Sequence, residues 1–375
     1  MKILFLCGSL ESGRDGVGDY TRRLASELIR QGHNASIIAL NDTHIKKIEK
    51  IEQESDGTQT SVLRIPSILS NKERHIALDE FINNYDPEWL SLQYVPYSFQ
   101  KRGLPFGLVK QLAKIGKGRK WHIMFHELWV GMDTASPLLL RMNGTLQKYL
   151  IIQLVKTLQP TIINTNTNLY KYQLNKSGFQ VSLLPLFGNI PVKFVKQKKE
   201  EDKLIFIVFG GIHFGADLEK FSEWLQQVQK DEKKNTKIWF VGKNGEDVKN
   251  WEKELQSKGI DFEIFGIQNE DTVSKLMSLS DIGIATTPYW LLEKSGSVAA
   301  MQEHSLPVIC LAREWIPNNV DESFIHKSIN KWSFSLTLHE IFNQETEPYT
   351  LQYVANILLK YINKNNGFTK LSLET

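Results

Sequence analysis

Short apolar runs alternate with segments of helical periodicity along this chain, and the alternation restarts about halfway along it. Residues 3–7 predict a buried strand, which a glycine-rich turn connects to an amphipathic helix ending near residue 31. Further strands of this first series are predicted at residues 35–40, 89–94, 121–125, 161–165 and 181–186. Such a strand–helix order is typical of a parallel sheet that helices cover on both faces.

A second series of the same kind follows residues 191–203, a polar and charged segment with the composition of a linker. It opens with an apolar strand at residues 204–209, again followed by a glycine pair, Gly210 and Gly211. Later strands are predicted at residues 237–241, 261–265, 281–286 and 307–311. The chain then closes on a predicted helix near residues 349–362.

We therefore predict an α/β fold with two Rossmann-like domains, an N-terminal one over residues 1–190 and a C-terminal one over residues 191–348. Residues 349–375 form a separate helical segment in this prediction. Ligands of doubly wound sheets bind beyond the carboxyl ends of the strands. Two such halves that face each other would place a ligand in the cleft between them.

Composition excludes several other classes of protein. The length of 375 residues corresponds to two or three domains of about 150 residues. A net charge of +3, from 45 basic and 42 acidic side chains, is too balanced to indicate nucleic-acid binding. Cys7 and Cys310 form neither a disulfide framework nor a metal-ligand spacing, and they fit a reducing compartment. No apolar run approaches the ~18 residues of a membrane span, so we expect a cytoplasmic protein.

The first glycine-rich turn is a candidate phosphate site. Gly16 and Gly18 lie where a strand leads into a helix, and backbone N–H groups at a helix N-terminus suit an anion. The turn has no Gly-Lys-Ser/Thr of a Walker loop, and its glycines do not have the order of the dinucleotide fingerprint. The alternative is a loop with a tight helix entry and no ligand.

His126 follows the predicted strand at residues 121–125, so it lies at a carboxyl end. A histidine there can orient a hydroxyl group or accept a proton. A purely structural histidine is the simpler alternative.

The segment of residues 101–120 is basic. No acidic side chain occurs between residues 89 and 126, while lysine and arginine recur through the segment and its helix has an apolar face. A basic amphipathic helix can lie on an anionic membrane, so the segment permits peripheral membrane contact. An ordinary crossover helix with a solvated face is the alternative.

Residues 286–309 are the most informative stretch. A predicted strand ends near Thr286, and Ser295, Gly296 and Ser297 can cap the next helix. The N–H groups, the two hydroxyls and Lys294 would then be available to a phosphate. Glu293 and Glu303 are placed to accept hydrogen bonds from sugar or ribose hydroxyls. A capped helix, however, needs no ligand.

Together these residues resemble the family-four retaining glycosyltransferases, which have the GT-B fold. The likeness rests on the loop and helix from Gly16 to His33, on Phe125-His126-Glu127, and on the stretch from Gly266 to Ile309. The resemblance implies an acceptor in the N-terminal domain and a nucleotide-sugar in the C-terminal one. It also implies a final helix that crosses back onto the first domain, and no metal or other cofactor.

The chain departs from the family pattern at the donor phosphates. The family places an arginine and a lysine after the first strand of the second domain, where residues 210–217 contain neither. A leaving diphosphate needs positive charge. The substitutes are Lys294, which we rank first, with Lys243, His213 and the two helix N-termini. Gly211 is a further expected donor-binding residue. The paired glutamates, Glu293 and Glu303, are also ten residues apart instead of eight.

The expected reaction is transfer of a hexosyl group from a nucleotide-sugar to an acceptor hydroxyl with retention, in glycan or polysaccharide biosynthesis. His126, Lys294 and Glu293 are the expected catalytic residues. The acceptor would be a carbohydrate or a lipid-linked group. Two alternatives stay open: a GT-B binding or scaffold protein without catalysis, and another nucleotide-sugar enzyme such as an epimerase.

Overall fold

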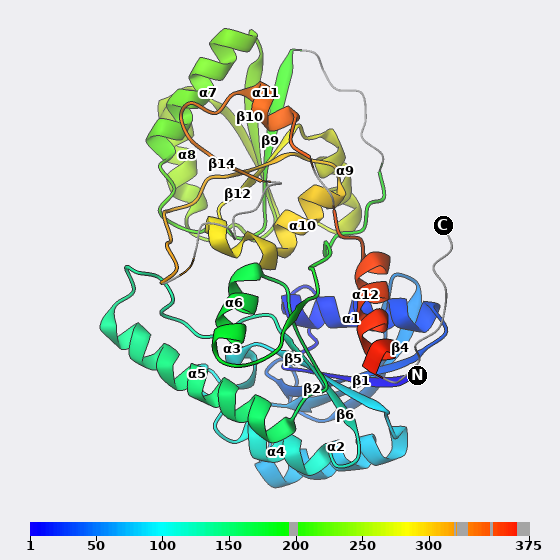
Figure 1. The fold of residues 1–375 in the computed structure, drawn as a ribbon. Coiled ribbons are helices and arrows are strands. Elements are labelled where there is room, and N and C mark those ends of the chain that lie inside the picture. Colours follow the sequence, from blue (N-terminus) through cyan, green and yellow to red (C-terminus); the bar gives the residue numbers. More distant parts are fainter. Residues whose placement is uncertain (195–201, 319, 321–328, 346–347, 366–375) are drawn as a thin grey trace. The chain divides into compact units, whose positions relative to one another are not determined.

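The computed structural model describes residues 1–194, 202–318, 320, 329–345 and 348–365 (Figure 1). The chain divides into two compact units, and each is an α/β sandwich around one sheet. Unit 1 comprises Met1–Pro185 and the segment that begins at Leu351, and unit 2 comprises Leu186–Thr350. Two Rossmann-like domains with mainly parallel sheets were predicted, and this prediction is confirmed.

The described residues of unit 1 form an eight-stranded sheet in the order β3-β4-β2-β1-β5-β6-β7-β8. Neighbouring strands pair in parallel except at the edge, where β3 and β4 are antiparallel. The strands are β1 (Lys2–Cys7), β2 (Asn34–Asp42), β3 (Glu49–Ser55), β4 (Thr58–Pro66), β5 (Trp89–Tyr94), β6 (Lys120–Phe125), β7 (Ile162–Thr165) and β8 (Ser182–Leu183).

Helices cover both faces of this sheet. They are α1 (Gly16–Arg30), α2 (Asn71–Tyr85), α3 (Pro96–Phe99), α4 (Leu108–Ile115), α5 (Leu138–Leu158), α6 (Asn168–Lys176) and α12 (Leu351–Asn365). From β1 to β2 the chain crosses toward the β3 edge of the sheet. From β4 through β5 and β6 to β7 it crosses toward the opposite edge, at β8. Because such crossovers are right-handed, α1 lies on the opposite face from α2, α4 and α5. Helix α2 packs against α4, α4 packs against α5, and α12 packs against α1.

The C-terminal helix α12 belongs to unit 1, although it follows unit 2 in the sequence. The hydroxyl of Tyr361 donates to the carbonyl of Leu183 at 3.0 Å, and the Lys120 ammonium donates to the Asn365 carbonyl at 3.4 Å. Val354, Ala355, Leu358 and Ile362 recur at helical spacing and are fully buried, which explains why this segment docks.

The described residues of unit 2 form a six-stranded parallel sheet in the order β11-β10-β9-β12-β13-β14. Its strands are β9 (Lys203–Phe209), β10 (Asn235–Val241), β11 (Asp261–Gly266), β12 (Ile282–Ala285), β13 (Val308–Cys310) and β14 (Asn330–Lys331). Its helices are α7 (Leu218–Glu232), α8 (Val248–Ser257), α9 (Glu270–Leu279), the 3-10 helix η1 (Tyr289–Lys294), α10 (Gly296–Glu303) and α11 (Leu338–Phe342).

Strand β9 shows why this sheet is buried on both faces. Phe206 and Val208 belong to the core under α7 and α8, whereas Ile207, between them in sequence, belongs to the core under α9 and α10. Alternate side chains of a strand point to opposite faces, so a continuous apolar run is needed here. Among the described residues, no helix is long and apolar enough to cross a membrane.

Candidate functional site

In the turn between β1 and α1, an acidic side chain of the turn itself occupies the helix N-terminus. Asp15 is the N-cap of α1, and its carboxylate accepts from the N–H groups of Val17 at 3.0 Å and Gly18 at 2.8 Å. A Cβ on Gly18 would lie 2.5 Å from the carbonyl oxygen of Ser9, so glycine permits close packing of the helix on the preceding loop. Gly16 begins the helix. A phosphate at Gly16 and Gly18 would have to take the place of the Asp15 carboxylate.

His126 lies directly after β6 and is buried. Its Nε2 is 2.9 Å from Oε1 of Gln93, and its ring meets the ring of Tyr20 edge to face with centroids 4.9 Å apart. The Gln93 amide donates in turn to Ser91 at 2.8 Å, and Ser91 Oγ is 2.8 Å from Nδ1 of His122. A chain of hydrogen bonds thus joins the two histidines across β5 and β6.

Burial makes both imidazoles neutral. Desolvation is the main cause and lowers the pKa of His126 to about 3 and that of His122 to about 4. Protonation of His122 would lower the pKa of His126 further, because two positive charges would then lie close together. Because Gln93 accepts through Oε1, Nε2 of His126 carries the proton and Nδ1 carries the lone pair. His126 can therefore orient a hydroxyl group by accepting its hydrogen bond, and it is a weak base.

In unit 2, the loop after β9 is held by the loops that follow two neighbouring strands. The side-chain amide of Asn244, after β10, donates to the carbonyl of Gly210 at 2.8 Å. Thr286, after β12, accepts from the N–H of His213 at 2.9 Å. Neither Asn244 nor Thr286 was among the predicted site residues, although their positions after strands were the available signal. They fix the loop at the carboxyl edge of the sheet.

The N-terminus of α10 lies against this loop. Ser295 is the N-cap and its hydroxyl accepts from the N–H of Val298 at 3.4 Å. A Cβ on Gly210 would lie 2.5 Å from Oγ of Ser297, and Gly210 has a φ of 85° that disfavours any other residue. Gly211, in contrast, has open space where a Cβ would be.

Positive charge gathers beside His213. Desolvation is the first cause that lowers the pKa of His213, and the charges of Lys294 and Arg313 lower it further, while the charge of Asp247 opposes them. Arg313 lies beyond β13, with its guanidinium 5.8 Å from the ring centroid of Phe214. A Cβ on Gly215 would lie 3.0 Å from Cβ of Arg313. Sequence reasoning missed Arg313 because nothing in its local sequence connects it with residues 213–215.

The remaining predicted residues lie around this centre. Lys243 is exposed and stands between Gly242 and Asn244, directly after β10. Glu293 lies in η1, next to Lys294. Glu303 is at the far end of α10, where its carboxylate accepts from the N–H of Gly188 at 2.8 Å.

The structure thus brings Gly211, His213, Lys294 and the Ser295–Gly296–Ser297 cap to one edge of the unit 2 sheet, and it adds Arg313. His126 lies at the corresponding edge of the unit 1 sheet. Across the described ranges, no group of three or more His, Cys, Asp or Glu side chains is arranged to hold a metal ion.

Comparison with known proteins relates the chain to others by structure alone, because no family model matches it and no curated protein sequence matches it. A glycosyltransferase of Rickettsia africae superimposes with a TM-score of 0.60 at 12% identity, over 98% of this chain and 99% of that one. A candidate UDP-N-acetylglucosamine 2-epimerase of Listeria monocytogenes superimposes with a TM-score of 0.58 at 12% identity, over 100% of this chain and 98% of that one.

Alr3699/HepE of Anabaena, solved with UDP and glucose, gives a TM-score of 0.55 at 13% identity, over 98% of this chain and 91% of that one. At such low identity these likenesses establish the fold. The chain has the α/β architecture of two Rossmann-like domains that GT-B glycosyltransferases and a nucleotide-sugar epimerase share.

Proposed function

We propose that this chain is a retaining glycosyltransferase that moves a hexosyl group from a nucleotide-sugar to a hydroxyl of a carbohydrate or lipid-linked acceptor. The observation that carries the proposal is the pair of cations, Lys294 and Arg313, beside His213 and the N-terminus of α10. Glycosyltransferases among the structural neighbours, and the UDP and glucose held by HepE, support a nucleotide-sugar donor. A role in glycan or polysaccharide biosynthesis follows from the same proposal.

The transfer needs positive charge at the leaving group. The bond between the anomeric carbon and the diphosphate oxygen breaks, and the acceptor oxygen bonds to that carbon on the same face. The acceptor hydroxyl loses its proton to the departing diphosphate, which also gains the electron pair. Lys294, Arg313 and the N–H groups at the start of α10 would stabilise that charge. They replace the arginine and lysine expected after β9.

The other residues take supporting roles in this proposal. Glu303 lies six positions after Ser297 in the same helix, about 9 Å along its axis. That length suits a ribose when the diphosphate lies at the helix N-terminus, so Glu303 would meet the ribose hydroxyls. Glu293 would accept from a donor sugar hydroxyl, Lys243 would contribute long-range charge, and neutral His126 would orient a substrate hydroxyl. Because Asp15 caps α1, we assign the diphosphate to unit 2 and not to Gly16 and Gly18.

Charge stabilisation by side chains makes a metal ion unnecessary in this mechanism. We expect sugar transfer to continue at full rate after dialysis against EDTA. A rate that falls and returns with Mg²⁺ or Mn²⁺ would refute this part of the proposal.

The first experiment is thermal unfolding with UDP, GDP, ADP, CMP and dTDP and their common sugar conjugates. A ligand at 100 times its Kd stabilises a two-state protein by about 2.7 kcal/mol, which shifts the midpoint measurably. We expect one nucleotide to shift it, and Lys294→Ala to abolish the shift. Absence of any shift would favour the scaffold alternative.

Analysis of the reaction products distinguishes a retaining glycosyltransferase from an inverting one and from an epimerase. With the stabilising nucleotide-sugar and a carbohydrate acceptor, we expect a glycoside whose anomeric coupling constant matches that of the donor sugar. An altered free sugar or nucleotide-sugar without glycoside would favour the epimerase alternative, and an inverted anomer would refute retention.

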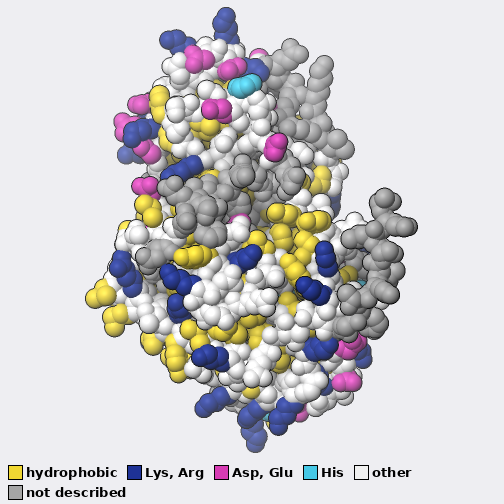
Figure 2. Space-filling model, in the orientation of Figure 1, with side chains coloured by type: hydrophobic (Ala, Val, Ile, Leu, Met, Phe, Trp, Pro, Cys, Tyr) yellow, Lys and Arg dark blue, Asp and Glu magenta, His cyan; other side chains and the backbone are white. Residues whose placement is uncertain are grey.

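We also propose that unit 1 contacts an anionic membrane through residues 101–120 and α5. Helix α5 contains no acidic residue, and Leu138, Leu139, Met142, Leu146 and Tyr149 are exposed on one side of it; Leu139 is 79% exposed. Arg141 flanks this apolar row. Figure 2 shows hydrophobic and basic side chains together over α5, where acidic ones are scarce. Apolar area with adjacent cations is the combination that binds anionic bilayers.

Vesicle sedimentation tests this contact. We expect binding to phosphatidylglycerol–phosphatidylcholine vesicles, no binding to pure phosphatidylcholine, and loss of binding in Leu139→Ser. Ile68→Ser, at an exposed apolar side chain elsewhere in unit 1, is the matched control and should bind normally. Equal loss in both variants would refute the α5 contact.

A further inference from the structure

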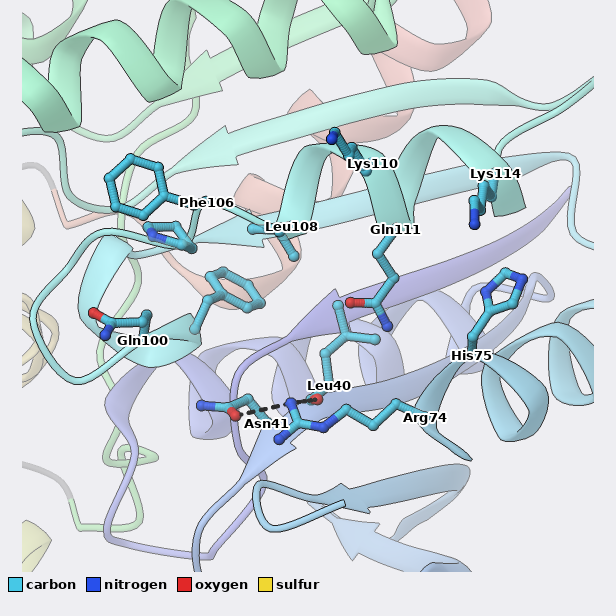
Figure 3. A pocket seen from close by; sticks show the side chains of 13 residues that line it. Leu40, Asn41, Arg74, His75, Gln100, Phe106, Leu108, Lys110, Gln111 and Lys114 are labelled. Atoms are coloured by element: carbon cyan, nitrogen blue, oxygen red, sulfur yellow. Dashed lines mark hydrogen bonds between the residues drawn. The ribbon is translucent and has the colours of Figure 1, made fainter. Parts of the chain in front are cut away.

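A cavity of about 390 Å³ opens in unit 1 between α2, α4 and the segment that connects α3 to α4 (Figure 3). It lies on the face of the sheet that α2, α4 and α5 cover, whereas His126 contacts Tyr20 of α1, on the opposite face. None of the residues used in the proposed transfer lines it. The cavity therefore needs an explanation of its own.

Its lining is strongly basic. Arg74 of α2 and Lys110 and Lys114 of α4 line it together with His75, and no acidic residue does. In Figure 3, Lys114 points from α4 toward His75 of α2. Within the described ranges, no carboxylate lies within ion-pair distance of these cations. Uncompensated positive charge around a concave surface attracts an anion.

Arg74 is fixed at the floor of the cavity. Its guanidinium donates to the carbonyl of Leu69 at 3.0 Å, to Oδ1 of Asn41 at 3.1 Å and to the carbonyl of Ser67. Burial lowers the pKa of Arg74 from its ordinary value, yet an arginine stays charged. The backbone thus holds a half-buried cation in one position, and its charge is balanced by carbonyl dipoles alone.

Two polar atoms of the cavity lack hydrogen-bond partners. Nε2 of Gln111 and Nδ1 of His75 are buried, and neither has a hydrogen-bond partner among the described residues. In Figure 3, Gln111 points from α4 down toward Arg74. Buried polar atoms without partners are rare in proteins because each costs stability. A ligand oxygen between α4 and α2 would satisfy the Gln111 amide.

The other side of the cavity is apolar. Phe99, Pro105 and Phe106 line it, and Phe106 is 63% exposed. An inorganic anion alone would leave this surface uncovered. A ligand with an apolar group beside its anionic group would use both sides.

We propose that this cavity binds a phosphate ester whose alcohol part is apolar. Two permanent cations, Arg74 and Lys114, together with the Gln111 amide exceed what one carboxylate can satisfy, whereas a phosphate has three terminal oxygens and two charges. Lys110 adds a third positive charge to the lining. Phosphate lies between α2 and α4, near Arg74, Lys114 and Gln111, and the apolar part lies on Phe99, Pro105 and Phe106. This site is independent of the proposed sugar transfer.

Calorimetric titration of the full chain tests the proposal, with inorganic phosphate and phenyl phosphate as probes. We expect one phenyl phosphate per chain, bound at least about tenfold more tightly than inorganic phosphate, because the ring covers apolar surface. Lys114→Glu should weaken both probes by about tenfold or more, since it reverses a charge at the anion. Lys117→Glu makes the same change just beyond α4, outside the lining, and should leave both affinities within about twofold.

A second variant tests the apolar side. Phe106→Ser should weaken phenyl phosphate and leave inorganic phosphate unchanged, because the side chain is exposed and its removal leaves the core intact. The proposal is overturned if neither probe binds at millimolar concentration, if Lys114→Glu and Lys117→Glu have equal effects, or if phenyl phosphate binds no tighter than inorganic phosphate. Loss of phenyl phosphate binding in Lys294→Ala would place the probe in unit 2 and also overturn it.

Competition identifies the source of the ester. If monomeric dihexanoylphosphatidic acid displaces phenyl phosphate, the result supports the cavity as a site for a lipid headgroup. If the lipid does not compete, while phenyl phosphate still binds and its affinity still depends on Lys114, the result supports the cavity as a site for a soluble phosphate ester.

Discussion

Gly210 and Ser297 approach each other so closely that a Cβ on residue 210 would lie 2.5 Å from the Ser297 hydroxyl oxygen. The contact joins the loop after β9 to the N-terminus of α10, where we place the donor diphosphate. Gly210→Ala should therefore both strain a backbone with φ of 85° and displace Ser297. We expect a loss of about 1–3 kcal/mol in unfolding free energy and weaker nucleotide binding.

Gly211→Ala is the matched control for that variant. A Cβ at residue 211 has nothing within 4 Å, so we expect less than about 0.5 kcal/mol of change in urea unfolding. Equal destabilisation by the two alanines would show that the Gly210–Ser297 contact has no special importance.

Lys294 and Arg313 should act together on the leaving group. We expect Lys294→Ala and Arg313→Ala each to lower kcat by about 10²–10³, because each removes a preorganised positive charge from the transition state. The double variant should lose less than the product of the two single effects, since the charges serve one diphosphate. Initial rates of sugar transfer with the identified donor measure this.

Lys249→Ala controls for general loss of charge in unit 2. Lys249 is exposed on α8 and pairs with Glu246, so its removal should leave kcat unchanged. Near-normal turnover in Lys294→Ala would contradict the assignment of this site.

The sequence predicted the strands of both sheets well where they are buried. The apolar runs at residues 3–7, 204–209 and 237–241 correspond to β1, β9 and β10. The hairpin of β3 and β4 was missed because β3 lies at the sheet edge and its side chains, Glu-Lys-Ile-Glu-Gln-Glu-Ser, are mostly polar and exposed. The Asp56-Gly57 turn between them, with positive φ at both residues, was the usable signal.

Helix α2 was missed for a related reason. Its apolar residues do not form a continuous stripe, although Ser70 and Glu73 form a capping box at its start. This miss also hid the phosphate-ester cavity, because Arg74 and His75 come from α2. The basic segment of residues 101–120 supplied the other wall and was visible in the sequence.

Only those residues of the candidate donor site that are neighbours in sequence could be predicted to lie together. Lys294 and the Ser295–Ser297 cap are adjacent in the chain, so their proximity follows from the helix start. Arg313 reaches the loop of residues 213–215 only because β13 lies two strands from β9 in the folded sheet. Long-range pairing of this kind leaves no pattern in one sequence.

The two buried histidines of unit 1 predict a pH dependence of stability. Their pKa values of about 3 and about 4 lie below the ordinary value near 6.5, so both are neutral in the folded chain and bind protons on unfolding below that pH. Stability should therefore be complete above pH 6.5 and fall as the pH drops toward 4. Each histidine contributes about 1.4 kcal/mol per pH unit within this window.

Urea unfolding at pH 7, 6 and 5 measures this slope. His126→Gln should lower the slope by about one proton, because it removes one group that binds a proton on unfolding. An unchanged slope in His126→Gln would mean that His126 is protonated in the folded chain, and its proposed role as a neutral acceptor would then fail.

The buried ion pair of Arg64 and Asp42 predicts the largest stability effect in unit 1. The Asp42 side chain is fully buried, and its Oδ2 accepts from Nε of Arg64 at 2.8 Å. Burial alone would raise the pKa of Asp42, but hydrogen bonds from Arg64 and from the N–H groups of His44 and Leu10 outweigh it and keep the pKa below its usual value. Arg64→Met should cost about 3–5 kcal/mol at pH 7, because it leaves a buried carboxylate unpaired.

Acid should partly rescue this variant. Without Arg64, burial raises the pKa of Asp42 above its unfolded value, so the protonated carboxyl is favoured in the folded chain and the deficit shrinks as the pH falls toward 4. Urea unfolding of Arg64→Met and the parent chain at pH 7 and 4.5 measures the difference. Arg30→Met breaks the partly exposed pair with Glu27 and should cost about 0–1 kcal/mol at both pH values. A deficit in Arg64→Met that does not change with pH would show that lost packing of the Arg64 stem, and not the charge of Asp42, accounts for the destabilisation.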